Sequence, residues 1–398
     1  MIKKFFLAVA LLLPMISGAG TCLCSKQVVG PRLPLVFDSY AQKWPSVAFD
    51  SLNGNYFITW TDTIDYKTYR IRGRLFSSFG GAITGTLEFD SSPSSFTARV
   101  LYNSVNQEFL VTWIAARTLY AQIITSDGRL ATPKLTVVAL SEQSSVDEYK
   151  VVLNTVQNEY LLMYLVTKTK RSEIFLQRMD RFGNKIRPAF WIAGATVIRP
   201  DVDYDRDSNR YLVSWETEAD VKGRIRFMIF NSYLQKIFNW ARTVPDSAPN
   251  ATSPRVVYDP ALREFVIFWR ECFTCEILHA TRYLPDGTGT GDRTLSIGGP
   301  IDFKDIRFNP LDDGFVFLYE TRTGSSPQLA RANARFQVTS KNVATNCQSG
   351  FQNGFSSLVY NSVLREFLVV WNYTDFPTQN DDIFAQRIRG VAQPGGCR

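Results

Sequence analysis

The chain has little of what catalytic and membrane proteins usually carry. Its 398 residues include one histidine, His279, and after residue 19 no run approaches 18 consecutive apolar residues. A membrane-spanning helix needs about 20 such residues, so no transmembrane segment is expected in the mature chain. Helical periodicity is also absent almost everywhere beyond the N-terminal segment, so the fold is expected to consist of β-strands.

The same scarcities limit the chemistry. His279 falls in a predicted strand, 277–282, where we expect a packed or edge histidine rather than a general base. The Cys272–Cys275 pair lacks the second CxxC or histidine pair of a zinc site. No catalytic residue, metal or cofactor is therefore assigned. The 44 basic residues form no stripe interleaved with aromatics, so no nucleic-acid partner is expected; the net charge of +7 leaves an anionic glycan as one candidate ligand.

The first 19 residues have the organisation of a secretory signal peptide. Lysines at positions 3 and 4 precede an apolar run from Phe5 to Leu13, and small residues end at Ala19. We therefore expect a secreted or cell-surface protein, extracellular or periplasmic. A lipid anchor at Cys22 is not expected, because Ala19 and Thr21 stand where a lipidation site prefers leucine and a small residue such as glycine, alanine or serine.

What the chain does contain is a short unit repeated seven times. Its clearest copy, Tyr360 to Trp371, has an apolar run ending in an aromatic residue and Asn, a polar turn, and a second apolar run ending in Trp. Successive copies end 53, 51, 51, 54, 50 and 52 residues apart, and a fixed period of this size indicates a repeat architecture. The closing aromatics are Trp60, Trp113, Tyr164, Trp215, Trp269, Tyr319 and Trp371. The turns open on Asp50, Asn103, Asn154, Asp205, Asp259, Asn309 and Asn361.

Each repeat predicts four antiparallel strands, a to d, and seven such units predict an all-β fold, a seven-bladed β-propeller. The last unit lacks a strand d, whereas residues 33–37 form an extra strand before the first. We expect this N-terminal strand to complete blade seven and close the ring, which removes two unpaired edges. Within one domain, residues 20–398, the blades are assigned to residues 45–90, 96–139, 148–193, 198–244, 253–298, 302–346 and 353–389.

An even number of cysteines after a signal peptide suggests disulfide bonds. Cys272 and Cys275 are expected to close a local loop. Cys397 meets Cys22 and Cys24 at the seam of the predicted ring, and a bond to either would fasten the closure. Whichever of Cys22 and Cys24 does not bond to Cys397 is expected to pair with Cys347, which lies between blades six and seven. The six candidates are Cys22, Cys24, Cys272, Cys275, Cys347 and Cys397.

The connection from strand b to strand c varies most in length between repeats. Counted from the closing aromatic of strand b to the first aliphatic residue of strand c, it spans 6 to 12 residues. In propellers these connections share one face with the d-to-a connections, around the mouth of the central channel. Variable loops on a rigid scaffold commonly carry binding sites, so we predict ligand binding on this b–c face. A rim of solvated strand ends is the simpler interpretation of each residue taken alone. The candidates are Asp62, Arg117, Glu216, Glu218, Arg270, Glu271, Glu320, Arg322 and Asp375.

Other patterns have simpler explanations. Residues 205–209 alternate oxygen ligands like a calcium loop, with Glu216 at the twelfth position, but Arg210 stands where the sharp turn needs glycine. A structural turn is therefore expected. The Ser-x-Asp-x-Gly-x-x-Trp turns of sialidases are absent. Asn250 and Asn372 lie in glycosylation sequons, which matter only in a eukaryotic source.

The unit Tyr-Asn-(x)4-Glu-Phe-Leu-Val-x-Trp, followed by Ile-x-Ala-Gln-Arg, resembles repeats of secreted and surface β-propeller proteins. It is most complete in Tyr102–Trp113 with Ala121–Gln122 and in Tyr360–Trp371 with Ile383–Arg387. The resemblance covers residues from about 33 to 389 and implies a propeller, but no particular activity. The paired glycines of kelch repeats and the WD dipeptides are missing.

The sequence therefore predicts a secreted, monomeric propeller that acts as an extracellular binding or adhesion module for a glycan or a protein. The alternative is a secreted polysaccharide hydrolase or lyase that uses carboxylates on the same face. A purely structural surface protein is the third hypothesis. Two carboxylates about 5–10 Å apart in a pocket at the mouth would favour the enzyme, whereas mixed polar groups with exposed aromatics would favour binding.

Overall fold

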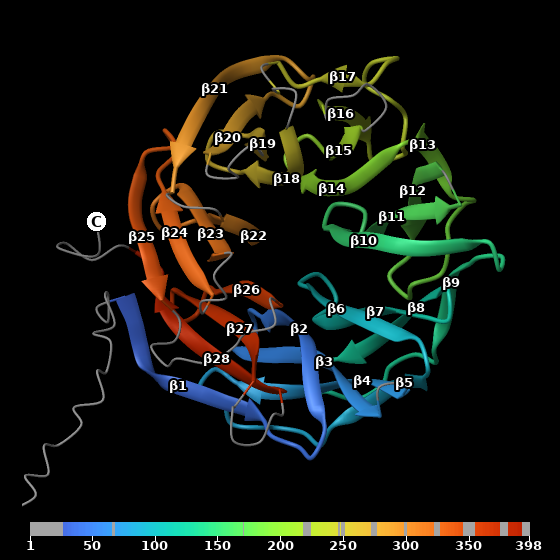
Figure 1. The fold of residues 1–398 in the computed structure, drawn as a ribbon, viewed down its shortest axis with the longest axis vertical. Helices are drawn as coiled ribbons and strands as arrows, with labels where there is room; N and C mark the ends of the chain where they lie inside the picture. The colour runs from blue at the N-terminus through green and yellow to red at the C-terminus, as the bar shows by residue number, and fades with distance from the viewer. Residues whose placement is uncertain are drawn as a thin grey trace, which may run out of the picture.

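The computed structural model describes residues 27–65, 68–169, 171–217, 224–245, 247, 251–271, 277–297, 301–321, 327–344, 355–374 and 381–391. These residues form seven four-stranded antiparallel sheets, arranged as blades around a central opening (Figure 1). The predicted seven-bladed β-propeller is confirmed. Within the described ranges there is no helix that could span a membrane. The signal-like residues 1–19 and all six cysteines lie outside them.

Each blade presents its strands in the order a to d from the channel outwards. Strands a are β2 (Ala41–Asp50), β6 (Ser95–Asn103), β10 (Ser144–Asn154), β14 (Val197–Asp205), β18 (Ala251–Asp259), β22 (Ile301–Asn309) and β26 (Ser356–Asn361). Strands b are β3 (Asn55–Asp65), β7 (Glu108–Ala115), β11 (Glu159–Lys168), β15 (Arg210–Thr217), β19 (Glu264–Glu271), β23 (Gly314–Thr321) and β27 (Glu366–Thr374).

The outer strands complete the blades. Strands c are β4 (Thr68–Ser77), β8 (Thr118–Thr125), β12 (Arg171–Met179), β16 (Arg224–Asn231), β20 (Ile277–Tyr283), β24 (Gln328–Ala332) and β28 (Asp381–Arg389). Strands d are β5 (Leu87–Ser92), β9 (Leu135–Ala139), β13 (Phe190–Ala195), β17 (Arg242–Thr243), β21 (Gly289–Ser296), β25 (Val338–Ala344) and β1 (Val28–Val36).

The N-terminal strand closes the ring, as predicted. β1 pairs antiparallel with β28, with Val28 opposite Ile388 and Leu33 opposite Ala385, and the two strands lie side by side in Figure 1, blue beside red. β1 begins earlier than the predicted strand at 33–37, and its ladder is interrupted twice. The guanidinium of Arg32 compensates in part, because it stacks 4.0 Å from the ring centre of Phe384.

The innermost strands are mostly longer than the four to six residues that the apolar run before each turn predicts. β26 has six, but the other six contain nine to eleven. Each of these six passes through a register shift near its start, such as the one between Lys43 and Ser46 in β2. The apolar run next to the turn predicts only the part of the strand after the bulge, whereas the residues before the bulge, polar in β2 and apolar in β14, are still paired with strand b. A bulge changes the direction of the side chains at a strand end. Here these strand ends lie at the b–c face.

The closing aromatic residues form the core of the blades. The five tryptophans, Trp60, Trp113, Trp215, Trp269 and Trp371, are at most 2% exposed. Strands b are buried on both sides because each blade packs against two neighbours, and apolar clusters accordingly span adjacent blades. This explains why their sequences are apolar without alternation.

The seven a–b turns share one conformation. In each, the side-chain oxygen of the opening Asp or Asn accepts a hydrogen bond from the backbone amide two residues later. Asp205 does this with Asp207, so the calcium-like sequence is a structural turn, as expected. The fourth residue after the opening residue always has a positive φ; these residues are Gly54, Gln107, Asn158, Asn209, Arg263, Asp313 and Arg365.

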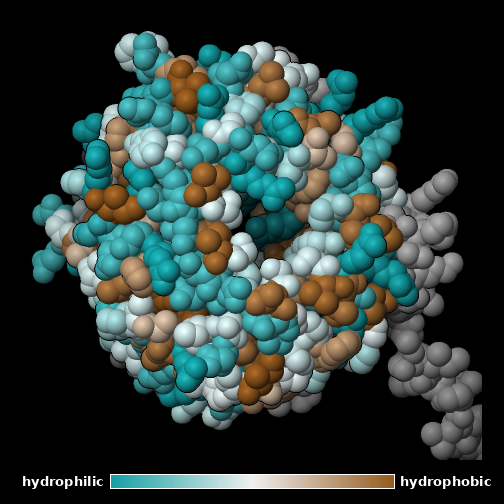
Figure 2. Space-filling view, turned by 180° about the vertical axis from the view of Figure 1, so that it is seen from behind, coloured by the Kyte–Doolittle hydropathy of each residue, from teal (hydrophilic) through white to brown (hydrophobic). Residues whose placement is uncertain are grey.

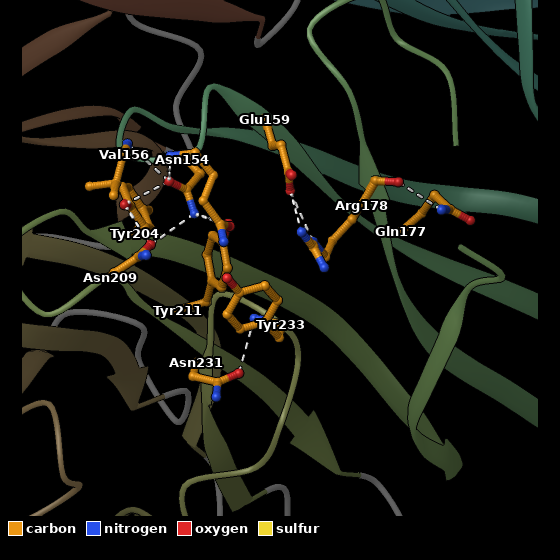
Figure 3. Close-up of polar contacts among 11 residues, drawn as sticks. Asn154, Val156, Glu159, Gln177, Arg178, Tyr204, Asn209, Tyr211, Asn231 and Tyr233 are labelled. Atoms are coloured by element: carbon orange, nitrogen blue, oxygen red, sulfur yellow. Dashed lines mark hydrogen bonds and ion pairs between the residues drawn. The ribbon is translucent and has the colours of Figure 1, made fainter. Parts of the chain in front are cut away.

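The same side chains connect neighbouring blades. Asn154 of blade 3 donates from Nδ2 to the hydroxyl of Tyr211 in blade 4 at 2.8 Å, and its Oδ1 accepts from Tyr204 at 2.8 Å (Figure 3). The equivalent bonds are Asn103 to Tyr160, at 2.9 Å, and Asn361 to Tyr56 across the seam, at 2.7 Å. In four blades the position equivalent to Tyr211 is Phe, which cannot accept this hydrogen bond. The turn-opening residue of the blade before is then Asp in three of the four cases.

Substitution of Tyr211 by Phe tests this connection, because it removes the acceptor of the Asn154 amide and leaves the ring. A buried hydrogen bond contributes about 0.5–1.5 kcal/mol, so we expect the free energy of unfolding in urea to fall by about 1 kcal/mol. Tyr360→Phe is the matched control, since its hydroxyl has no hydrogen-bond partner among the described residues. Equal losses in the two variants would contradict the assignment.

A second prediction concerns the close approach of β23 and β24. A Cβ on Gly314 would lie 2.2 Å from the carbonyl oxygen of Ala332, so Gly314→Ala must displace backbone. We expect a loss of about 1–3 kcal/mol in urea unfolding. Gly85→Ala is the control, because a Cβ there meets nothing within 4 Å. An unchanged midpoint for Gly314→Ala would show that the two strands can separate without cost.

Candidate functional site

The seven strands a enclose a central cavity of about 820 Å³. Viewed from the side opposite to Figure 1, it is a hollow at the centre of the molecule with mainly hydrophilic residues around it (Figure 2). Its wall carries charged side chains of both signs from blades 2 to 6. The cavity is therefore an axial space lined by both charged and apolar side chains.

One position on each strand a, four residues before the turn-opening Asp or Asn, forms what we call the channel belt. Lys150 pairs with Asp201 at 2.8 Å, and Asp201 also accepts from the backbone amide of Val256 at 2.7 Å. Because neighbouring strands a belong to different sheets, such contacts replace a backbone ladder between them. The belt consists of Ser46, Arg99, Lys150, Asp201, Arg255, Asp305 and Ser357.

Three of the predicted site residues share one position on successive blades, directly after the closing aromatic of strand b. These are Glu216, Arg270 and Glu320. Glu216 accepts at Oε2 from Thr252 Oγ1, at 2.8 Å, and it pairs with Arg199 Nη1 at 2.8 Å. It thus connects the end of blade 4 to the start of blade 5.

The contacts continue around the mouth. Arg270 donates to Ser253 Oγ at 3.0 Å and lies 3.4 Å from Asp302 Oδ1. Lys304 bridges Asp302, at 2.8 Å, and Glu320, at 3.4 Å. We call this set the mouth network; it runs from blade 4 to blade 7 and comprises Arg199, Glu216, Thr252, Ser253, Arg270, Asp302, Lys304, Glu320 and Ser356.

Two carboxylates of the mouth network have pKa values displaced in opposite directions. Burial raises the pKa of Glu320, although the charge of Lys304 opposes this. Partial burial acts against ionisation of Asp302 too, but the hydrogen bond from Lys304 and the charges of Lys304 and Arg270 outweigh it and lower that pKa. One carboxyl is thus biased toward the protonated form and its neighbour toward the ionised form.

The other predicted residues lie apart from this network. Asp62 is 0% exposed within blade 1, where Trp60 Nε1 donates to it at 2.8 Å and Arg72 pairs with it at 3.1 Å; burial raises its pKa. This environment gives Asp62 a structural role. Arg117 is exposed in a tight turn between β7 and β8, in which Ala116 and Arg117 both have positive φ.

Glu271 faces the strand-c neighbour rather than the mouth network. Its Oε2 lies 3.2 Å from Nε2 of His279, and the imidazole stacks on Trp269 with ring centres 5.3 Å apart. His279 is therefore a packed strand residue in β20, as its sequence position predicts. Glu218, Arg322 and Asp375 lie outside the described residues.

The sequence did not identify Trp44, Arg199 and Ser253, which occupy equivalent positions at the start of three strands a. All three have left-handed backbone conformations, with φ of 54°, 49° and 55°. Such conformations are costly for residues other than glycine and cluster at functional sites. The internal period could have placed them together, but nothing in the sequence indicates the bulge that turns them toward the mouth.

No protein-family model and no curated protein matches the chain. Among solved structures it is similar to the Dos1 propeller, at 8% identity over 92% of this chain and 96% of that one, TM-score 0.50. An oligogalacturonate lyase in complex with manganese gives 10% identity over 91% and 98%, TM-score 0.51. The propeller domain of the Trilobed protease from Pyrococcus furiosus, described as having an open velcro topology, gives 9% over 88% and 99%, TM-score 0.50. These likenesses show the β-propeller fold.

Glu216→Gln tests how far the mouth network supports the ring. The carboxylate accepts three hydrogen bonds, from Arg199, Thr252 and the Ser253 amide, and an amide cannot accept all of them with equal strength. We expect a loss of about 1–3 kcal/mol in the free energy of unfolding. Glu271→Gln, on the adjacent blade, should stay within about 0.5 kcal/mol. If Glu216→Gln is as stable as the wild type, the network is not structural.

Proposed function

We propose that the protein is an extracellular binding module that recognises a glycan or a protein on its b–c face. The observation that carries this proposal is the mouth network, which runs from blade 4 to blade 7 and reaches the axial cavity at Lys304 and Ser356. Its side chains come from the ends of strands, so the blades hold them in place, and a rigid polar rim costs little ordering entropy on binding. The extracellular location rests on the signal-like residues 1–19.

Groups available to a ligand remain at this rim. The side chain of Asp302 is 51% exposed although it contacts Arg270 and Lys304, and Phe355, beside the start of β26, is 44% exposed. Mixed charges with an exposed aromatic ring are typical of surfaces that bind polar ligands. The unequal b–c connections add variable surface around the same rim.

The alternative, a polysaccharide hydrolase or lyase, is favoured by a specific observation. Glu320 and Asp302 share Lys304, and their pKa values are shifted in opposite directions. Two carboxyl groups held in opposite protonation states can serve as general acid and base. Against this, Glu320 is only 8% exposed, so a substrate would reach it only after displacing Lys304 or Ser356.

A screen of the mature chain on a glycan array, followed by pull-down from extracellular fractions, tests the binding proposal. Asp302→Ala should reduce retention of the recovered ligand at least tenfold, because it removes an accessible carboxylate of the mouth network that a ligand can contact. Asp127→Ala is the matched control: its side chain is 53% exposed and paired with Arg129, in the c–d turn of blade 2. Equal effects of the two variants would place binding elsewhere.

The catalytic alternative has its own test. Acidic and neutral polysaccharides are incubated with the mature chain, and new reducing ends and unsaturated products are measured. Glu320→Gln should abolish any turnover if Glu320 is the general acid, since an amide cannot donate its proton, while Glu271→Gln should retain it. Turnover that survives Glu320→Gln would exclude this assignment.

A further inference from the structure

The wall of the central cavity contains two basic residues that have no acidic partner among the described residues. Lys150 and Arg307 are neutralised by Asp201 and Asp305, at 2.8 and 2.9 Å. By contrast, Arg99 of blade 2 and Arg255 of blade 5 form no ion pair with any residue that the structure describes. Arg99 lies 5.6 Å from the ring centre of Tyr149, and Arg255 donates only to the carbonyl of Pro254. Both line the cavity, so two guanidinium groups there can accept an anion.

A carboxylate without a partner faces the same space. Glu148 stands two residues before Lys150 on β10, past the bulge in that strand, and it lines the cavity. Within the described ranges it makes no hydrogen bond or ion pair. Burial raises its pKa, while Arg255, Arg199 and Arg99, from three other blades, act in the opposite direction. The guanidinium groups are thus near enough to influence Glu148, yet they do not contact it.

Aromatic side chains contribute to the wall from blades 1 and 7. Trp44 contacts Phe355 edge to face, with ring centres 5.5 Å apart, and Tyr69 at 6.3 Å. Trp44 and Phe355 both line the cavity. The left-handed backbone of Trp44, with φ of 54°, is unusual for so large a residue. It holds the indole at the mouth, where a flat apolar surface can stack against a ligand.

We propose that the channel mouth binds an acidic sugar, a uronate unit of a glycan, through Arg99, Arg255, Glu148 and Trp44. The two guanidinium groups pair with the carboxylate, an arrangement that arginine geometry favours. Glu148 accepts a hydrogen bond from a ring hydroxyl, and the indole covers the apolar ring face. A cavity of about 820 Å³ lies within the usual range for small-molecule sites. This inference rests on the proposed function and names its ligand class.

Other ligands satisfy fewer of these groups. A neutral sugar leaves both guanidinium groups unpaired, and an inorganic anion uses neither Glu148 nor the aromatic wall. A free amino acid without an aromatic side chain would place its ammonium on Glu148 but offers no ring for Trp44. The uronate therefore matches the three kinds of group that the cavity presents.

The test uses calorimetry on the mature chain with methyl glucuronide and methyl galacturonide, each compared with its neutral methyl glycoside, sodium sulfate and glycine. We expect at least one uronide to bind at least tenfold more tightly than its neutral counterpart, and sulfate and glycine not to displace it at equal concentration. Equal affinity for the neutral glycoside, or displacement by sulfate or glycine, would overturn the proposal.

Variants locate the site. Arg99→Gln and Arg255→Gln should each weaken uronide binding at least fivefold and leave the weaker neutral binding unchanged, whereas Trp44→Ala should weaken both. Arg129→Gln is the control, an arginine in the c–d turn of blade 2 with its side chain 80% exposed. If Trp44→Ala fails to fold, the two arginine variants still decide. Uronide binding that persists in the double variant Arg99→Gln/Arg255→Gln would reject this site.

The result separates the two proposals. If no uronide binds but an array or pull-down ligand is lost in Asp302→Ala, the b–c face is a binding surface and the acidic-sugar inference is wrong. If neither a uronide nor any screened ligand binds, both are wrong.

Discussion

The ring depends on side-chain contacts between blades, because each sheet ends at its own strand a and, among the strands that the structure describes, no backbone ladder joins one blade to the next. The Asn154–Tyr211 contact illustrates how a single residue meets this constraint. The side-chain oxygen of Asn154 accepts a hydrogen bond within its own turn, and its side-chain NH2 group donates to Tyr211 of the following blade. Turn formation and blade registration are thereby coupled, so a blade that folds correctly also presents the group that positions its neighbour.

On the b–c face, charged side chains make the contacts between neighbouring blades. There, Glu216, Arg270 and Glu320 reach from the end of one strand b to the start of the next strand a. Two of these contacts are hydrogen bonds from a hydroxyl to a carboxylate, and the third is the ion pair between Arg270 and Asp302. A consequence is that the structural contacts of this face are themselves polar and partly accessible.

The sequence predicts the fold well because the period is carried by buried residues. Trp371 and its equivalents, with the Asx turns, are constrained by packing and by hydrogen bonding in every blade. The channel residues are harder to identify, because Arg99, Glu148 and Arg255 come from blades 2, 3 and 5 and meet only when the ring closes. Glu216 and Glu320 were identified because they follow a closing aromatic directly. Asp62 comes two residues after the closing aromatic Trp60, and it is buried within blade 1, a direction that spacing alone does not specify.

The hydrogen bonds and ion pairs distinguish the residues of the mouth network from those of the channel. Glu216 has three donors on one oxygen, and a ligand would have to replace interactions that already stabilise the ring. Arg99, Arg255 and Glu148 have no ion pair to give up on binding, because none of the three forms one with a residue that the structure describes. Desolvating such groups costs free energy unless a ligand compensates them. Under the acidic-sugar proposal, the channel residues therefore bind the carboxylate of the ligand, and the mouth network supports the rim around them.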